Sequence, residues 1–162
     1  MKAILYSVHP FERIAFDRAN SAHSHELTYL AAPLDPTTAR LAEGSAAVIP
    51  SLNDIVDATL LQLLANHGVR LIALRSAGYN NLDVAAAERM GIRAVYVPAY
   101  TPHAVAEHVF ALTLALLRHI PRAYARVRDA NFDVEGLIGT QLNSRRFGIV
   151  GLGKIGRVVA DI

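Results

Sequence analysis

Short apolar runs alternate with helical apolar patterns along the first hundred residues. An apolar run bounded by turn residues predicts a buried strand, and apolar positions three or four residues apart predict a helix. The predicted strands are 2–8, 25–30, 46–49, 71–74 and 94–97. The predicted helices are 10–20, 37–41, a third that begins at the capping residue Asp54 and stops at Gly68, and 83–89. Strands that are apolar throughout and alternate with helices indicate a parallel sheet covered on both faces, so residues 1–98 are expected to form a complete small α/β domain.

The pattern changes after Pro98. A long helix is predicted over 103–119, and its apolar residues surround the helix instead of lining one face. Such a helix is expected to be buried on all sides. A loop-like segment follows over 131–143, then a predicted strand over 147–150 and a helix that begins near residue 157.

Composition narrows the classes of protein. Hydrophobic residues make up 52% of the 162 positions, which excludes a disordered chain. The chain contains no cysteine, which excludes a disulfide scaffold and any cysteine-ligated metal site. A net charge of +2 gives no basic footprint for nucleic acid. No apolar run has the length of a membrane span, and no signal peptide is recognisable, so a cytoplasmic protein is expected.

The glycines at 151, 153 and 156 form a G-x-G-x-x-G pattern between the predicted strand and the last helix. In a dinucleotide-binding turn the first glycine permits the tight turn, the second lets the backbone approach a pyrophosphate, and the third lets the helix pack closely. The helix N-terminus then attracts the phosphates. The alternative is a glycine-rich turn that binds nothing. The acidic residue that would distinguish NAD from NADP is expected about 20 residues further along, so this choice stays open.

Two other loops could carry chemistry. The loop 75–81 follows the fourth strand, and ligands of open parallel sheets bind at the carboxyl ends of strands. The Ala77 and Gly78 amides could bind a carboxylate there, and an ordinary turn is an equally good interpretation. The segment 98–102 has a proline at each end and reads as a stiff hinge. In it Tyr100 could present its hydroxyl to a cleft or pack within the linker. His103, Glu107 and His108 lack the spacing of a zinc motif, so no metal site is predicted.

Four segments in order resemble the NAD-dependent D-2-hydroxyacid dehydrogenases, and among them the bacterial D-lactate dehydrogenases. They are LRSAGYNNLD at 74–83, VPAYTPHAVAEH at 97–108, RDANF with EGL within 128–137, and GIVGLGKIG at 148–156. Residues 1–70 match more loosely, chiefly in the order of strands and helices. The resemblance implies a flavodoxin-like substrate domain over 1–98. Residues 99–162 would then supply a hinge, a dimerisation helix and the first strand–helix unit of a Rossmann domain.

The resemblance also implies an activity and a set of site residues. NADH would reduce a small 2-keto acid, with pyruvate to D-lactate favoured over relatives that act on glyoxylate, phosphoglycerate or formate. The amides of Ala77 and Gly78 would hold the substrate carboxylate, and Tyr100 would line the pocket. The cofactor pyrophosphate would lie against the turn formed by Gly151, Gly153, Lys154, Ile155 and Gly156. The helix 103–119 would join two copies of the chain.

The family's catalytic arginine, glutamate and histidine lie beyond the glycine motif. No catalytic residue is therefore assigned within the 162 residues, and the chain is expected to be a truncated form that is inactive alone. The alternative is a non-catalytic module that binds a carboxylate or pairs with a longer relative.

Overall fold

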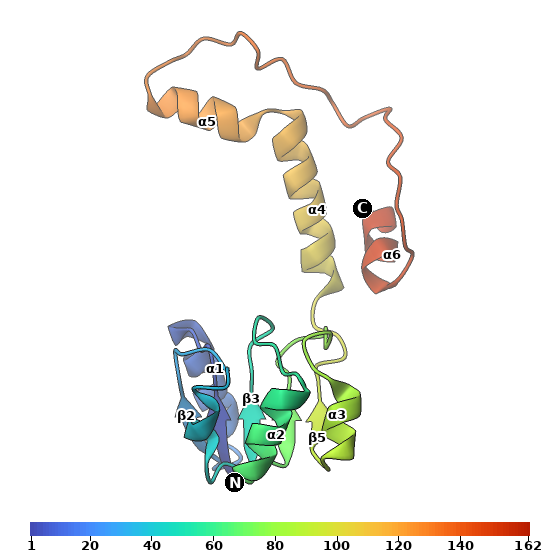
Figure 1. The fold of residues 1–162 in the computed structure, drawn as a ribbon. Coiled ribbons are helices and arrows are strands. Elements are labelled where there is room, and N and C mark those ends of the chain that lie inside the picture. The colour runs from blue at the N-terminus through green and yellow to red at the C-terminus, as the bar shows by residue number, and fades with distance from the viewer. The chain divides into compact units, whose positions relative to one another are not determined.

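A computed structural model describes all 162 residues, which divide into two compact units, Met1–Tyr100 and Thr101–Ile162. The first unit is built on a five-stranded, wholly parallel sheet in the order β2-β1-β3-β4-β5 (Figure 1). Its strands are β1 (Lys2–Leu5), β2 (Glu26–Tyr29), β3 (Ala47–Ile49), β4 (Leu71–Ala73) and β5 (Arg93–Val95). This is the flavodoxin-like strand order, with the change of direction between β1 and β3. The predicted α/β class is confirmed.

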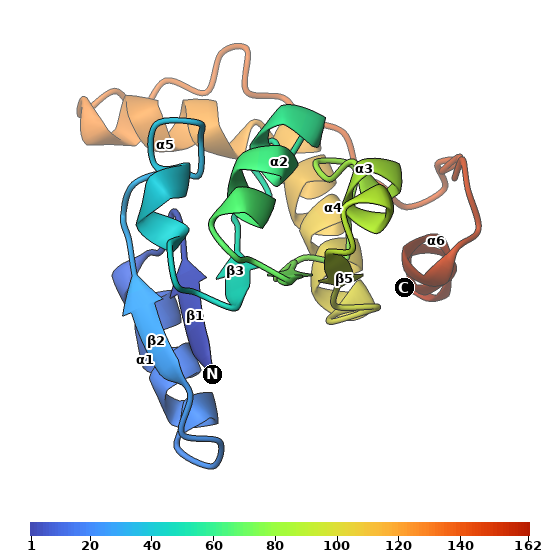
Figure 2. The same ribbon diagram turned by 60° about the horizontal axis from the view of Figure 1, so that its bottom comes forward.

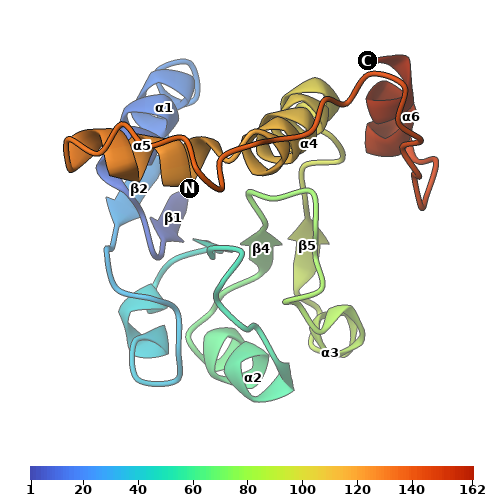
Figure 3. The ribbon, with the colours of Figure 1, turned by 90° about the horizontal axis from the view of Figure 1, so that it is seen from above.

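Helices lie on both faces of this sheet, but they cover it unequally. Helix α1 (Pro10–Asn20) lies on one face, and α2 (Ala58–Asn66) and α3 (Val84–Arg89) lie on the other (Figure 3). The core sits on the face of α2 and α3, where Leu60, Leu61 and Leu64 pack over buried strand residues such as Ile72. Each such leucine contributes about 1.5–3 kcal/mol by its burial. Helix α1 has no fully buried residue, so its face contributes much less.

Strands β1 and β2 lie side by side at one edge, with Ala3 opposite Leu27 and Leu5 opposite Tyr29 (Figure 2). The chain then crosses back to β3 through a 3₁₀ turn, η1 (Ala39–Ala42). This turn is tied to the sheet by Tyr6, whose hydroxyl donates a hydrogen bond of 3.0 Å to the carbonyl of Thr38. The buried Tyr6 ring thus fixes the crossover that places β3 beside β1.

Helix α2 begins three residues later than predicted. Asp57 is its N-cap, because the Asp57 carboxylate accepts a hydrogen bond of 2.8 Å from the Leu60 amide. Asp54 is instead buried at 4% exposure, before the helix begins. Two aspartates three residues apart are both plausible caps, and only the packing of the preceding loop distinguishes them.

The second unit contains α4 (Pro102–Leu117), α5 (Ile120–Arg128) and α6 (Lys154–Asp161), with α6 against α4 (Figure 1). The predicted long helix is confirmed as α4, but its expected burial on all sides is not found. Ala106 is its one buried residue, and Leu116 is 73% exposed. Residues 101–162 contain too few other elements to cover an apolar surface on every side of a sixteen-residue helix.

The chain turns sharply between α4 and α5, where His119 adopts a left-handed conformation with φ of 52°. Two arginines of α5 then hold the segment that follows. Arg126 Nη1 donates to the carbonyls of Asp133 at 2.9 Å and Glu135 at 2.7 Å, and Arg122 lies beside Gly136. The segment returns to the end of α4, where the Thr140 amide donates to the Leu117 carbonyl at 2.9 Å.

The predicted strand 147–150 is wrong. These residues form no ladder, because no other strand in residues 101–162 lies beside them to exchange hydrogen bonds. The segment is held by side chains instead, with the Phe147 ring stacked on Phe110 of α4 at 5.5 Å between centroids.

We expect Tyr6→Phe to lower the free energy of unfolding at pH 7 by about 1–2 kcal/mol, because the Thr38 carbonyl loses its donor. Burial, aided by the charge of Asp35, raises the pKa of Tyr6 from 10.0 to about 12. The raised pKa stabilises the folded state fully below pH 10, and this contribution is lost as the pH rises from 10 through 12. The difference between wild type and variant should therefore shrink over that range in urea unfolding.

The matched control for Tyr6 is Tyr124→Phe, since the Tyr124 side chain is 64% exposed. This variant should unfold like the wild type at every pH. A Tyr6→Phe protein whose stability deficit persists unchanged to pH 12 would contradict the assigned hydrogen bond.

Candidate functional site

Three loops meet at the carboxyl edge of the sheet in the first unit. They follow β1 at 6–9, β3 at 50–54 and β4 at 74–81. The carboxyl ends of parallel strands share one edge, and a change of strand direction opens a crevice there. The loop after β4 contains the predicted carboxylate-binding residues Ala77 and Gly78, so the structure puts them at the edge where open α/β sheets bind ligands.

The Ala77–Gly78 turn presents two unused donors. The Ser76 hydroxyl donates to the Gly78 carbonyl at 2.7 Å, and the Val97 amide donates to the Ser76 carbonyl at 3.2 Å. Neither the Ala77 nor the Gly78 amide donates to another group of the protein. Gly78 is exposed and Ala77 partly so, and consecutive free amides of this kind can bind a small anion.

Five polar side chains join the three loops, and we call them the three-loop network: Ser7, Glu12, Asp54, Arg75 and Asn81. Arg75 Nη2 donates to the carbonyls of Tyr6 and Ser7, each at 2.9 Å. The Ser7 hydroxyl donates to Asp54 Oδ1 at 3.0 Å. Asn81 Nδ2 donates to the carbonyls of Ser51 at 3.2 Å and Asp54 at 2.9 Å.

Glu12 completes the network from α1. Its Oε1 lies 3.4 Å from Arg75 Nη1, and its Oε2 accepts a hydrogen bond of 2.8 Å from the His9 amide. Arg75 Nη1 is buried and makes no aligned hydrogen bond, so its contact with Glu12 is ionic. The guanidinium charge is therefore neutralised within the loop cluster.

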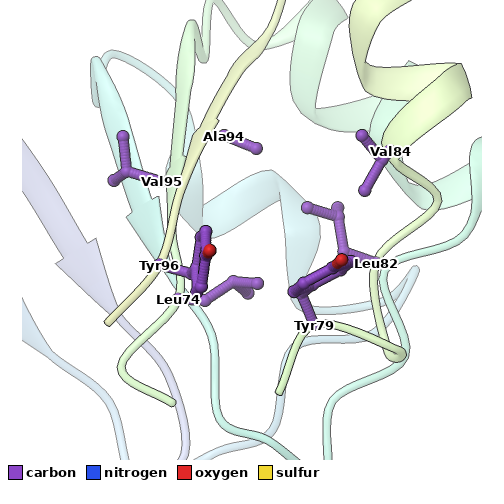
Figure 4. Close-up of a pocket in the computed structure, with 7 residues that line it drawn as sticks. All are labelled: Leu74, Tyr79, Leu82, Val84, Ala94, Val95 and Tyr96. Carbon is purple, nitrogen blue, oxygen red and sulfur yellow. The ribbon is translucent and has the colours of Figure 1, made fainter. Parts of the chain in front are cut away.

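Apolar surface flanks the turn on two sides. A Cβ atom placed on Gly78 would lie 4.0 Å from Leu52 Cδ1, so the side chain of Leu52 reaches over the turn from the loop after β3. Next to the turn lies a pocket of about 250 Å³ whose lining includes Tyr79 and Tyr96, and the centroids of these two rings lie 5.3 Å apart (Figure 4). Tyr100 lies further along and is 67% exposed.

The three glycines of the turn in the second unit, Gly151, Gly153 and Gly156, have different conformations and surroundings. Gly151 has a φ of +97°, a conformation that side chains disfavour. A Cβ atom on Gly156 would collide with the Gly151 carbonyl oxygen, so the turn folds directly onto the start of α6. Nothing lies within 4 Å of a Cβ atom on Gly153, so that side of the turn is open.

The first turn of α6 is open to a ligand as well. Gly153 caps the helix without a side chain, and the amides of Lys154, Ile155 and Gly156 have no protein acceptor. Free amides at a helix N-terminus bind phosphate groups. These amides border a pocket of about 720 Å³ whose walls also include Val109, Phe147 and Val159. The residues present thus fit the pyrophosphate of a dinucleotide.

The predicted site residues therefore fall into two groups. Ala77, Gly78 and Tyr100 lie in the first unit, and Gly151, Gly153, Lys154, Ile155 and Gly156 lie together in the second. The three-loop network was not predicted from the sequence. The available signal was a polar residue shortly after each of three apolar strands, namely Ser7, Asp54 and Arg75.

Comparison with known proteins decides the family. The model of the D-isomer specific 2-hydroxyacid dehydrogenase catalytic domain matches residues 3–139. This chain belongs to the D-2-hydroxyacid dehydrogenase family. A 2-hydroxyacid dehydrogenase homolog of Schizosaccharomyces pombe is 45% identical over 160 residues, which are 99% of this chain and 48% of that protein.

Solved D-2-hydroxyacid dehydrogenase structures give the same result. The apo-structure of D-lactate dehydrogenase from Escherichia coli has a TM-score of 0.91 and 41% identity, covering 99% of this chain and 51% of that one. D-lactate dehydrogenase from Aquifex aeolicus, complexed with NAD and lactic acid, has a TM-score of 0.80 and 26% identity, covering 98% and 47%. The chain thus spans about half the length of the relatives it matches. None of its helices is long and apolar enough to cross a bilayer.

We expect Gly156→Ala to destabilise the second unit by about 1–3 kcal/mol, because the new methyl group forces α6 away from the Gly151 carbonyl. Amide chemical shifts should change over residues 149–160, and hydrogen exchange should accelerate in α6. Gly148→Ala is the matched control, since nothing lies within 4 Å of its Cβ position. Equal behaviour of the two variants would show that α6 does not pack on the turn.

Proposed function

We propose that this chain carries the substrate-carboxylate site and the cofactor-pyrophosphate site of an NAD-dependent D-2-hydroxyacid dehydrogenase. The observation that carries the proposal is the pair of unused amides at Ala77 and Gly78, on the ligand-binding edge of a parallel sheet. The substrate class is a small 2-keto acid, and pyruvate, the oxidised form of D-lactate, is the favoured member. The D-lactate dehydrogenases among the similar structures support that choice.

The roles of the binding residues follow from their groups. The amides of Ala77 and Gly78 would each donate to one oxygen of the substrate carboxylate and so fix its orientation. Leu52, beside Gly78, supplies an apolar side chain on one side of that position. Tyr100 is assigned to the wall of the substrate pocket, and its exposed ring is free to take part.

The cofactor proposed is NAD, and the neighbour complexed with NAD supports it. When bound, NADH would supply a hydride to the carbonyl carbon of the keto acid and become NAD, and the carbonyl oxygen would take up a proton for which no residue of this chain is assigned. Gly151 forms the turn, Gly153 leaves room for the pyrophosphate, and the amides of Lys154, Ile155 and Gly156 bind its oxygens. We assign 1–98 to the substrate domain, and 99–162 to the hinge, the dimerisation helix and the start of the cofactor domain.

The proposal is tested with oxamate, an unreactive analogue of pyruvate, added to the ¹⁵N-labelled 162-residue chain. Because the Ala77 and Gly78 amides gain an acceptor, their proton resonances should move downfield and saturate with a single dissociation constant. Oxamide, which matches oxamate in size but has an amide in place of the carboxylate, is the control ligand and should leave both resonances in place.

A polypeptide of these 162 residues should bind without turnover, since no residue among them is assigned as the catalytic acid–base group. NADH absorbance at 340 nm should stay constant in the presence of pyruvate. Unmoved Ala77 and Gly78 resonances at saturating oxamate would refute the substrate site, and NADH oxidation would refute the expected inactivity.

We further propose that α4 joins two copies of the chain. Its leucines at 112, 114 and 116 are 53%, 42% and 73% exposed, an apolar surface that a second copy would cover. The wild-type chain should sediment as a dimer at micromolar concentration. The double substitution Leu112→Ser with Leu116→Ser should yield monomers, because both residues lie on one helix face.

The control for the interface is Ile55→Ser in the first unit, where Ile55 is 72% exposed. This variant should remain a dimer. A wild-type chain that sediments as a monomer would rule out the proposed dimer.

A further inference from the structure

We propose that Arg75 is a positioning residue that, with Asp54 and Asn81, closes a ring of hydrogen bonds around the carboxylate-binding turn. The ring joins the loops after β1, β3 and β4 pairwise and so fixes the direction of the Ala77 and Gly78 amides. This inference rests on the proposed function, since it explains how two free amides are held ready for a carboxylate.

The first side of the ring joins β4 to β1. Arg75, the second residue after β4, donates through Nη2 to the carbonyls of Tyr6 and Ser7, each at 2.9 Å. Those carbonyls belong to the first two residues after β1. The bond pair spans 68 and 69 positions of sequence and ties the start of the turn to the loop after β1, on the other side of β3.

The second side joins β1 to β3. Ser7 donates through Oγ to Asp54 Oδ1 at 3.0 Å, and Asp54 Oδ2 accepts from the Ser51 amide at 2.7 Å. Asp54 is 4% exposed and is the one buried charged residue of the chain. Ser7 has a φ of 51°, a left-handed backbone conformation that residues other than glycine keep only where surrounding contacts stabilise it. The hydrogen bond between Ser7 and Asp54 therefore stabilises the conformation of Ser7 and gives the buried carboxylate a donor.

The third side joins β3 back to the far end of the turn. Asn81 Nδ2 donates to the carbonyls of Ser51 and Asp54. These two residues are also hydrogen-bonded to each other, since the Asp54 amide donates to the Ser51 carbonyl. The segment 75–81 is therefore anchored at its first and last residues. Between the anchors, the Ser76 hydroxyl bond to the Gly78 carbonyl shapes the turn.

The geometry argues against a direct role of Arg75 as a substrate ligand. Its Nη2 is engaged by two carbonyls, and its Nη1 is buried beside Glu12, with the side chain 15% exposed. Its charge is already paired with the Glu12 carboxylate at 3.4 Å. What the guanidinium supplies is a fixed planar fork, which a lysine ammonium does not reproduce.

The test is Arg75→Lys, which keeps the positive charge and removes the fork. We expect the dissociation constant of oxamate, followed at the Ala77 and Gly78 resonances, to rise about tenfold, as loss of a paired hydrogen bond to a charged donor predicts. Hydrogen exchange of the Val97 amide, which donates to the Ser76 carbonyl of the turn, should accelerate, while that of core amides in β3 stays slow. Arg93→Lys, an exposed charge on β5, is the matched control and should bind oxamate like the wild type.

A second variant, Ser7→Ala, opens the ring on another side and leaves every charged residue in place. It should weaken oxamate binding about threefold and accelerate Val97 exchange in the same direction, so the proposal remains testable if Arg75→Lys fails to fold. Thermal melting of each variant separates loss of fold from loss of alignment, because a merely structural role would lower Tm and leave the dissociation constant of the folded chain unchanged.

The outcomes separate this inference from the proposed function. If wild-type resonances at Ala77 and Gly78 do not respond to oxamate, the proposed function fails. If the wild type responds and folded Arg75→Lys or Ser7→Ala binds oxamate as tightly, the substrate site stands and the positioning role of the ring is wrong.

Discussion

Parallel strands all end at the same edge of their sheet, and the polar backbone that leaves them there must find partners among buried neighbours. In this chain hydrogen bonds that cross from loop to loop meet the constraint together with bonds inside each loop. Arg75 donates hydrogen bonds to carbonyls in the loop after β1. Ser7 donates to the Asp54 carboxylate in the loop after β3, and Asn81 donates to carbonyls of that same loop. These hydrogen bonds leave the amides of Ala77 and Gly78 without a partner in the protein, so both amides are available to bind a ligand.

The two units face different physical problems. The first has its own core between the sheet and helices α2 and α3, and hydrogen bonds between its loops stabilise them. The second has a long apolar helix, one buried residue on it, and a returning segment held by arginines through backbone carbonyls. The apolar surface that stays exposed on this helix is typical of a protein–protein interface.

Much of the fold could be predicted from the sequence, because apolar runs of three to five residues between helical patterns leave few alternatives to a parallel sheet. The glycine turn could be predicted too, because its requirements are local. Gly151 takes a positive φ, and a Cβ atom on Gly156 would collide with the Gly151 carbonyl. Long-range polar contacts could not. Asp57 caps α2, whereas the Asp54 carboxylate accepts hydrogen bonds from the Ser51 amide and from the hydroxyl of Ser7, which lies 47 positions away. The segment 147–150 reads as a strand, yet strand formation requires a neighbour that no local pattern guarantees.

The pair of mutually tilted tyrosine rings beside the turn gives the protein a characteristic optical property. The chain has no tryptophan and six tyrosines, so its near-ultraviolet circular dichroism arises from few chromophores. Tyr79 follows Gly78 directly, and its ring lies 5.3 Å from that of Tyr96 at an interplanar angle of 58°. Exciton coupling between two rings depends on their distance and angle. A change in the geometry of the turn should therefore alter the near-ultraviolet circular dichroism spectrum of the unlabelled protein.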